Sequence, residues 1–237
     1  MASMIFAVAN QKGGVGKTTL TLNLAGAVCD QYLRNKKDGD EEFRVLVIDA
    51  DPQNTSMRSA GVAKVELPFS VISLAGRVDM GREIQKLAAG YDVVFIDCPP
   101  AKEGRATERA MRVADFVLIP LDASAADLWS TAGMLEEFPN LAGEIDPNKA
   151  AIVFNKTNKR LKSFGTTKKV LTTASPFRIL QTVIPQREIY RTCMATGTTV
   201  FTIKGERRAR EAQEEIHAVL EEALQVMHRL EEPSNAA

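Results

Sequence analysis

The sequence predicts an α/β fold in which helices flank a doubly wound, mostly parallel sheet. Short apolar runs recur along the chain, helical segments alternate with them, and a glycine-rich turn separates the first run from the first helix. Apolar runs without polar alternation are typical of parallel strands that are covered on both faces. Repeated β-α-β alternation indicates a parallel sheet. We therefore expect one such sheet to organise the chain.

The first apolar run, Met4–Ala9, predicts a buried strand, and residues 10–19 follow it as N-Q-K-G-G-V-G-K-T-T. Phosphate-binding loops read G-x-x-x-x-G-K-[ST], and residues 16–18 fit the end of this pattern. Gln11 stands where the first glycine is expected, and Lys12 adds a second lysine. One loop does not easily direct two ammonium groups at the same triphosphate. We therefore expect Lys12 to reach the nucleotide of a second subunit.

The remaining residues of this loop have the properties that phosphate binding needs. Glycines let backbone N–H groups approach phosphate oxygens, and the helix that begins near Thr18 favours anions at its N-terminus. We expect Lys17 to contact the β- and γ-phosphates and the Thr18 hydroxyl to ligate Mg²⁺. The predicted nucleotide-binding residues of the loop are Lys12, Gly13, Gly14, Val15, Gly16, Lys17, Thr18 and Thr19.

Two later apolar runs end in carboxylates. The strand predicted at 44–49 leads into Asp49 and Asp51, which project to the same side of an extended backbone. The strand predicted at 91–97 ends in Asp97, which suits the outer Mg²⁺ shell of a phosphoryl-transfer site. Acids at strand ends are often only helix caps. Together with the loop, in this order, they predict a nucleotide site at the carboxyl edge of the sheet.

The rest of the chain continues the alternation of strands and helices. Residues 34–42 predict an exposed loop, and strands are expected at 116–120 and 150–154. Helices are expected near 80–89, 105–114, 125–138, 166–173, 188–195 and 206–231. We expect a single domain over residues 1–232 and a disordered tail over 233–237.

The motifs K-G-G-V-G-K-T at 12–18, D-A-D-P-Q at 49–53 and D-C-P-P at 97–100 resemble those of ParA-type partition ATPases. These are P-loop NTPases of the deviant Walker type, related to the MinD-type division-site ATPases. The resemblance covers nearly the whole chain, because residues 114–120 and 183–185 also resemble the later strands of the family. It indicates the short subclass without an N-terminal helix-turn-helix domain.

The resemblance implies a homodimer that forms with ATP and Mg²⁺ and in which Lys12 crosses to the partner's phosphates. The implied catalytic residues are Lys12, Lys17 and Asp51, with Asp51 orienting the attacking water. The implied metal residues are Thr18, Asp49 and Asp97. Asn155 is similar to the residue that reads the adenine edge in some relatives, with a structural loop cap as the alternative, and Pro185 joins it as a nucleotide-binding residue.

Charge is balanced over the chain, with 30 Lys or Arg and 30 Asp or Glu, but it is uneven locally. Residues 151–210 hold 13 basic and two acidic residues, a net charge of +11, whereas residues 211–237 hold one and seven, a net charge of −6. A basic block of this kind predicts binding to a phosphate backbone without sequence preference. The alternative is a solvated basic face.

The resemblance favours non-specific DNA binding in the ATP state, through basic residues near the last helix. The residues expected to contact DNA are Lys204, Arg207, Arg208 and Arg187. Arg187 is included because Gln186 stands where many relatives have arginine.

Composition argues against several other classes of protein. No apolar run approaches the roughly 20 residues that span a membrane. The three cysteines form no C-x-x-C pair, which disfavours disulfides and a thiolate metal site. The last helix has an apolar stripe typical of core packing. Its polar face is rich in glutamate, which disfavours binding to an anionic membrane. We expect a cytoplasmic, nucleoid-associated protein without a membrane partner.

The expected function is a slow, Mg-dependent ATPase that dimerises on ATP, binds DNA and is released when a ParB-like or other adaptor stimulates hydrolysis. In this way it would segregate plasmid or chromosomal DNA. A second candidate is the same mechanism applied to a protein cargo such as carboxysomes or chemoreceptor clusters. Rival functions on the same fold are a membrane-associated division-site ATPase, a metallocluster carrier, and a metabolic ligase or small-molecule kinase.

Overall fold

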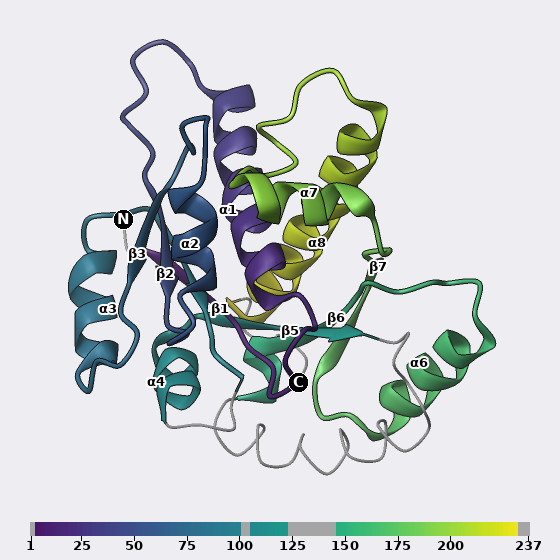
Figure 1. Cartoon of the computed structure of the whole chain (residues 1–237). Coiled ribbons are helices and arrows are strands. Elements are labelled where there is room, and N and C mark those ends of the chain that lie inside the picture. The colour runs from purple at the N-terminus through teal and green to yellow at the C-terminus, as the bar shows by residue number, and fades with distance from the viewer. Residues whose placement is uncertain (1–2, 101–104, 123–145, 232–237) are drawn as a thin grey trace.

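The computed structural model describes residues 3–100, 105–122 and 146–231, and its strands form one seven-stranded sheet (Figure 1). The strand order is β3-β2-β4-β1-β5-β6-β7, and every pairing is parallel. The strands are β1 (Met4–Val8), β2 (Val45–Asp49), β3 (Ser70–Ser73), β4 (Val93–Asp97), β5 (Phe116–Asp122), β6 (Ala150–Asn155) and β7 (Arg178–Val183). The predicted doubly wound parallel sheet is confirmed.

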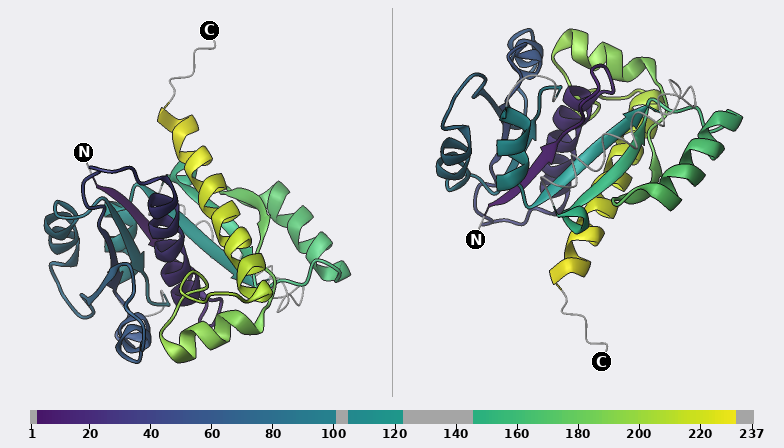
Figure 2. Two further views of the ribbon diagram at one scale, coloured as in Figure 1. Left: turned by 90° about the horizontal axis from the view of Figure 1, so that it is seen from above. Right: turned by 90° about the horizontal axis from the view of Figure 1, so that it is seen from below.

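Helices cover both faces of the sheet. They are α1 (Lys17–Asn35), α2 (Thr55–Gly61), α3 (Met80–Ala88), α4 (Ala106–Val113), α6 (Lys162–Ala174), α7 (Glu188–Thr196) and α8 (Arg207–Glu231), with a short 3₁₀ turn at Pro147–Lys149. Helices α1 and α8 lie side by side on the same face of the sheet, as the left view of Figure 2 shows.

The core has two apolar layers because alternate residues of each strand face opposite sides of the sheet. In β1, Phe6 and Val8 pack in the layer that includes α1, α7 and α8. Ile5 and Ala7 pack in the layer that includes α3, α4 and α6. The predicted apolar stripe of the last helix is part of the first layer, where Ile216 is buried. Core packing of this stripe is therefore confirmed.

The structure adds α2 and β3, which the sequence did not predict, and it places β7 at Arg178–Val183, earlier than the expected residues 183–185. The two added elements are short: α2 reads T-S-M-R-S-A-G, and β3 is an edge strand of four residues with no buried position. Neither carries an apolar period long enough to be recognised. The exposed loop is confirmed but starts at Lys36, because α1 continues to Asn35. The helix expected at 125–138 and the tail at 233–237 lie outside the described residues.

The parallel arrangement brings the carboxyl ends of the central strands to one edge of the sheet. Val8 and Asp49 are both in register with Asp97, and Asp122 is in register with Asn155. The order of the strands reverses at β1, which lies between β4 and β5. Ligands of open α/β sheets bind at such a reversal point. Among the described residues, no helix is long and apolar enough to cross a membrane.

Candidate nucleotide-binding site

The glycine-rich loop connects β1 to α1 and closes on itself. Gly14 and Gly16 have positive φ angles of 79° and 92°, which favour glycine. The Lys17 Nζ donates a 3.1 Å hydrogen bond to the carbonyl oxygen of Lys12. Lys17 is buried, and burial lowers its pKa, an effect that the nearby Asp97 carboxylate partly opposes. The loop therefore wraps around the ammonium group that its sequence motif assigns to phosphate.

Asn10 holds the start of the loop, a role that the sequence analysis missed. Its Nδ2 donates to the carbonyl oxygen of Pro120 at 2.8 Å, and its Oδ1 accepts from the Lys12 backbone N–H at 2.8 Å. These bonds tie the loop to β5. Lys12 itself is exposed. Its side chain is thus accessible to a second subunit, as the prediction requires.

Asp97 is buried, and only one of its carboxylate oxygens has a hydrogen-bond donor among the described residues. The Ser56 hydroxyl donates to Asp97 Oδ2 at 2.7 Å, whereas Oδ1 is buried and has no donor in hydrogen-bonding geometry among the described residues. Burial raises the pKa of Asp97 to about 7, and the Ser56 and Thr18 hydroxyls oppose this shift. A buried carboxylate oxygen without a partner, on an acid that also interacts with the Thr18 hydroxyl, fits a hydrated cation.

Asp49 supports the backbone around α2. Its Oδ1 accepts from the Asp51 N–H and its Oδ2 from the Met57 N–H, each at 3.0 Å. Burial raises the pKa of Asp49, and these two bonds oppose the shift. Asp51 is half-buried, and its Oδ1 accepts from the Gln53 N–H at 2.8 Å. Both acids lie at the predicted edge, and each also organises the turn that leads into α2.

No cluster of three or more His, Cys, Asp or Glu side chains that could hold a metal ion occurs among the described residues. Mg²⁺ does not need such a cluster, since it usually keeps several waters and binds one or two protein oxygens together with substrate phosphates. The Asp97 oxygen and the Thr18 hydroxyl fit this requirement.

A cavity of about 630 Å³ lies beside the loop, which is in the usual range for small-molecule sites. Its lining combines the start of α1, the ends of β6 and β7, and parts of α2, α7 and α8. The lining includes Thr19, Asn155, Lys156, Ile184, Pro185 and Tyr190. Asn155 and Pro185, which are far apart in the sequence, thus share one cavity next to the phosphate loop.

Within this cavity Asn155 supports the loop. Its Nδ2 donates to the carbonyl oxygen of Val15 at 2.8 Å, and its Oδ1 accepts from the Lys156 N–H at 3.0 Å. A Cβ at Gly16 would collide with Asn155 Nδ2. These two bonds fit the loop-cap alternative for Asn155, while its contact with the adenine edge stays a prediction.

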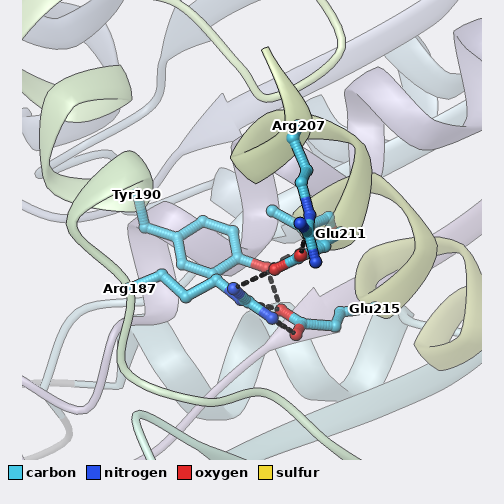
Figure 3. A network of polar contacts seen from close by, with 6 residues as sticks. Arg187, Tyr190, Arg207, Glu211 and Glu215 are labelled. Carbon is cyan, nitrogen blue, oxygen red and sulfur yellow. Dashed lines mark hydrogen bonds and ion pairs between the residues drawn. The ribbon is translucent and has the colours of Figure 1, made fainter.

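The four basic residues expected to bind DNA separate into two groups. Lys204, Arg207 and Arg208 are exposed at the start of α8 and just before it. Arg187, in contrast, forms an ion-pair network with α8, in which Glu215 accepts from its Nε and Nη2 and Glu211 from its Nη1 (Figure 3). Arg187 is therefore paired with glutamates of α8 in this conformation, and its contact with DNA stays a prediction.

This network is hidden in the sequence when the charges are counted separately before and after the boundary between residues 210 and 211. Helix α8 continues across that boundary, so Glu211 also accepts from Arg207 at 3.1 Å. The Tyr190 hydroxyl donates to Glu215 at 3.1 Å, and burial together with Glu215 raises the pKa of Tyr190. Part of the basic block is thus balanced by the acidic segment that follows it.

Comparison with known proteins agrees with this geometry. The family model of the CobQ/CobB/MinD/ParA nucleotide binding domain matches residues 6–200. The chain belongs to this family. The match spans the loop, the three acids and most of the cavity lining of this CobQ/CobB/MinD/ParA domain, and the ParA-type resemblance of its motifs is confirmed.

Two relatives of this CobQ/CobB/MinD/ParA protein cover most of its length. Maintenance of carboxysome distribution protein A of Halothiobacillus neapolitanus is 29% identical over 221 residues, which cover 92% of this chain and 95% of that protein. Sporulation initiation inhibitor protein Soj of Bacillus subtilis is 26% identical over 227 residues, which cover 77% of this chain and 84% of that protein.

A solved structure of a McdA variant from Cyanothece in complex with ATP has a similar fold. The TM-score is 0.64 at 17% sequence identity, and the match covers 94% of this chain and 97% of that one. At this identity the likeness supports the fold.

Proposed function

We propose that this protein is a Mg²⁺-dependent ATPase that dimerises on ATP and positions a cellular cargo by switching between DNA-bound and free states. The observation that carries the proposal is the pair of lysines in one loop. Lys17 is buried with its ammonium group held by the Lys12 carbonyl, whereas the Lys12 side chain is exposed. Two lysines with such different environments suit one phosphate contact within the subunit and one across a dimer.

In the proposed site each chain residue has a distinct task. Lys17 and the loop N–H groups of residues 13–19 hold the phosphates, and Lys12 contacts the phosphates bound to the partner subunit. Asp51 orients the attacking water. Thr18 and Asp97 hold the Mg²⁺ shell, with Asp49 supporting it through the turn before α2. When bound, Mg²⁺ supplies charge neutralisation on the phosphate oxygens.

We assign the base of the nucleotide to the cavity beside the loop. Its volume and its apolar lining, which includes Ile184, Pro185 and Tyr190, suit a planar ring. The cavity begins at Thr19 on the first turn of α1, so a nucleoside there can extend its phosphates toward the helix N-terminus.

DNA binding is proposed for the start of α8. This helix has no acidic residue in its first turn, and Arg207, Arg208 and nearby Lys204 are exposed there. Basic residues at a helix N-terminus oppose the helix dipole, so an anion that binds there gains from both the dipole and the side chains. Arg207 pairs with Glu211 at 3.1 Å, and this pair is largely exposed. Exposed pairs contribute little and are readily exchanged for phosphate.

Two cargoes fit the proposal. The first is plasmid or chromosomal DNA carried by a ParB-like adaptor that stimulates hydrolysis, with the protein associated with the nucleoid. The second is a protein body, and it is favoured by the relative named for carboxysome distribution, which covers 92% of this chain. Both cargoes use the same ATPase cycle and differ only in the adaptor.

The proposal is tested by DNA binding with ATP, with ADP and without nucleotide, for wild type and Lys12→Ala. We expect salt-sensitive binding with ATP only, and we expect Lys12→Ala to weaken it or to uncouple it from turnover. Equal binding in all three nucleotide states would refute the switch. ATP turnover that needs neither DNA nor a protein stimulator would favour a metabolic ligase or kinase instead.

A further inference from the structure

The residue after β6, Lys156, has an unusual backbone and a contact with the phosphate loop. Its φ angle is +54°, and among the described residues other than glycine only Asn54 shares this left-handed conformation. Its Nζ donates a 2.6 Å hydrogen bond to the carbonyl oxygen of Gly14. The contact joins positions 142 residues apart. Lysine has no local hydrogen bond that compensates for positive φ, so the surrounding structure must enforce this conformation.

The neighbours of Lys156 are firmly held. Asn155 donates to the Val15 carbonyl, and the Thr157 N–H donates to the Ile184 carbonyl at 3.1 Å. Thr157 is buried. The backbone of Lys156 is therefore fixed on both sides, which directs its side chain along the loop.

Asn155 and Lys156 together hold two successive carbonyl groups of the phosphate loop, those of Val15 and Gly14. Carbonyl groups that point toward Asn155 and Lys156 leave the N–H groups of the loop free to face the opposite side, where phosphate oxygens bind. Lys156 also lines the 630 Å³ cavity, which is the region assigned to the base.

We propose that Lys156 is a positioning residue for the nucleotide: its ammonium group fixes the Gly14 carbonyl, and its methylene stem forms a wall of the base pocket. The stem would contact the face of a purine ring, because lysine stems are apolar while their ammonium groups stay polar. This inference rests on the proposed nucleotide function and assigns to Lys156 a task that neither Lys12 nor Lys17 performs.

The variant Lys156→Asn tests the proposal. Asparagine tolerates positive φ better than lysine does, so the fold is expected to be as stable as wild type or more stable. The variant lacks both the stem and the ammonium group. We expect a fluorescent ATP analogue to dissociate about tenfold faster, which corresponds to the loss of one hydrogen bond to a charged group. Lys159→Asn, at an exposed lysine three positions later, is the matched control and is expected to dissociate at the wild-type rate.

Hydrogen exchange without nucleotide gives a second readout that does not depend on ATP binding. We expect the amides of residues 13–17 to exchange faster in Lys156→Asn than in wild type and in Lys159→Asn. If wild type fails to bind the ATP analogue, the proposed function fails, and the exchange result still decides the role of Lys156.

Two outcomes would overturn the inference. One is wild-type dissociation and wild-type loop exchange in Lys156→Asn. The other is faster dissociation accompanied by a clearly lower free energy of unfolding, since that would make Lys156 a general structural residue. Lys156→Met retains the stem alone and is expected to dissociate at an intermediate rate. Dissociation of the ATP analogue from Lys156→Met at the wild-type rate would show that the ammonium group does not help to hold the nucleotide.

Discussion

The Ser56 hydroxyl donates a 2.7 Å hydrogen bond to Asp97 and so ties α2 to the end of β4. Asp97 is buried, and its second carboxylate oxygen lacks a hydrogen-bond donor among the described residues. Ser59, one turn further along α2, donates to the Met194 carbonyl of α7 at 3.2 Å. Helix α2 therefore contacts both the acid of the proposed metal shell and one wall of the nucleotide cavity.

The free energy of unfolding without nucleotide should depend on pH through Asp97. Its pKa is about 7 in the folded protein, above the ordinary 3.8, so the unfolded carboxyl group loses its proton first as pH rises. The protein should therefore lose stability relative to Asp97→Asn between about pH 4 and 7. Urea unfolding of both proteins at several pH values measures this difference. Asp38→Asn, at an exposed carboxylate of the 36–42 loop, is the control. The prediction would be contradicted if the free energies of unfolding of wild type and Asp97→Asn changed with pH in parallel.

The two lysines of the loop should separate nucleotide binding from dimerisation. Lys17→Gln should weaken ATP binding by about 10- to 100-fold, because a charge-assisted hydrogen bond to phosphate is lost. Lys12→Ala should retain ATP binding by the monomer and lose the ATP-dependent dimer. Titration with a non-hydrolysable ATP analogue and sedimentation of the same samples measure the two effects. Equal losses of affinity in both variants would show that Lys12 acts within its own subunit.

Gly16 should be far less tolerant of substitution than Gly13. Gly16 has a φ of 92°, and a Cβ there would collide with the Asn155 amide. A Cβ at Gly13 would meet nothing within 4 Å. A left-handed non-glycine residue alone costs about 1–2 kcal/mol. Gly16→Ala should therefore lower the free energy of unfolding by at least about that amount and should abolish binding of an ATP analogue. Gly13→Ala should fold like wild type, and similar losses in both variants would contradict the proposed role of Asn155.

The sequence was sufficient to predict the residues whose position follows from strand ends. Asp49, Asp97 and the loop lie at one edge of the sheet because parallel strands end there, and their order in the chain indicated this. The elements α2 and β3 were missed because segments of seven and four residues are too short to show a period. The long apolar stripe of α8 was identified because its period extends over many turns.

The roles of single side chains were less predictable because they depend on contacts between distant residues. Asn10 bonds across 110 positions and Lys156 across 142, and neither type of residue has a sequence motif for holding a loop. Arg187 and Glu215 are 28 positions apart, and Arg187 lies in the basic segment 151–210 whereas Glu215 lies in the acidic segment 211–237. When charge is counted over segments of the sequence, the two residues of such a pair fall into different segments, whereas the fold brings them into contact.

The exposed basic residues at the start of α8 should govern the salt dependence of DNA binding. Each lost phosphate contact lowers the slope of log K against log salt by about 0.9. The double variant Arg207→Ala/Arg208→Ala should therefore reduce the slope by about 2 in the presence of ATP. Its ATP binding should remain normal. An unchanged salt slope in the double variant would show that DNA does not bind at the start of α8.

Arg187 should contribute to stability and not to DNA binding. Its guanidinium bonds to Glu215 at 2.6 Å and to Glu211 at 2.8 Å, with 27% of the side chain exposed. Arg187→Ala would leave Glu215 and the Tyr190 hydroxyl in a half-buried site without their cation. Because the site is partly solvated, we expect the free energy of unfolding to fall by about 1–3 kcal/mol. The salt slope of DNA binding should stay at the wild-type value.

Arg191→Ala is the matched control for this prediction. Arg191 lies one turn further along α7, is 66% exposed, and pairs with Glu188 at 3.4 Å. Exposed pairs contribute about 0–1 kcal/mol, so this variant should unfold almost like wild type. Urea unfolding and DNA binding at two salt concentrations, measured on both variants, separate the roles. If Arg187→Ala unfolded like wild type and lost about one unit of salt slope, Arg187 would leave its glutamates to bind DNA, and the network in Figure 3 would be a latch that phosphate opens.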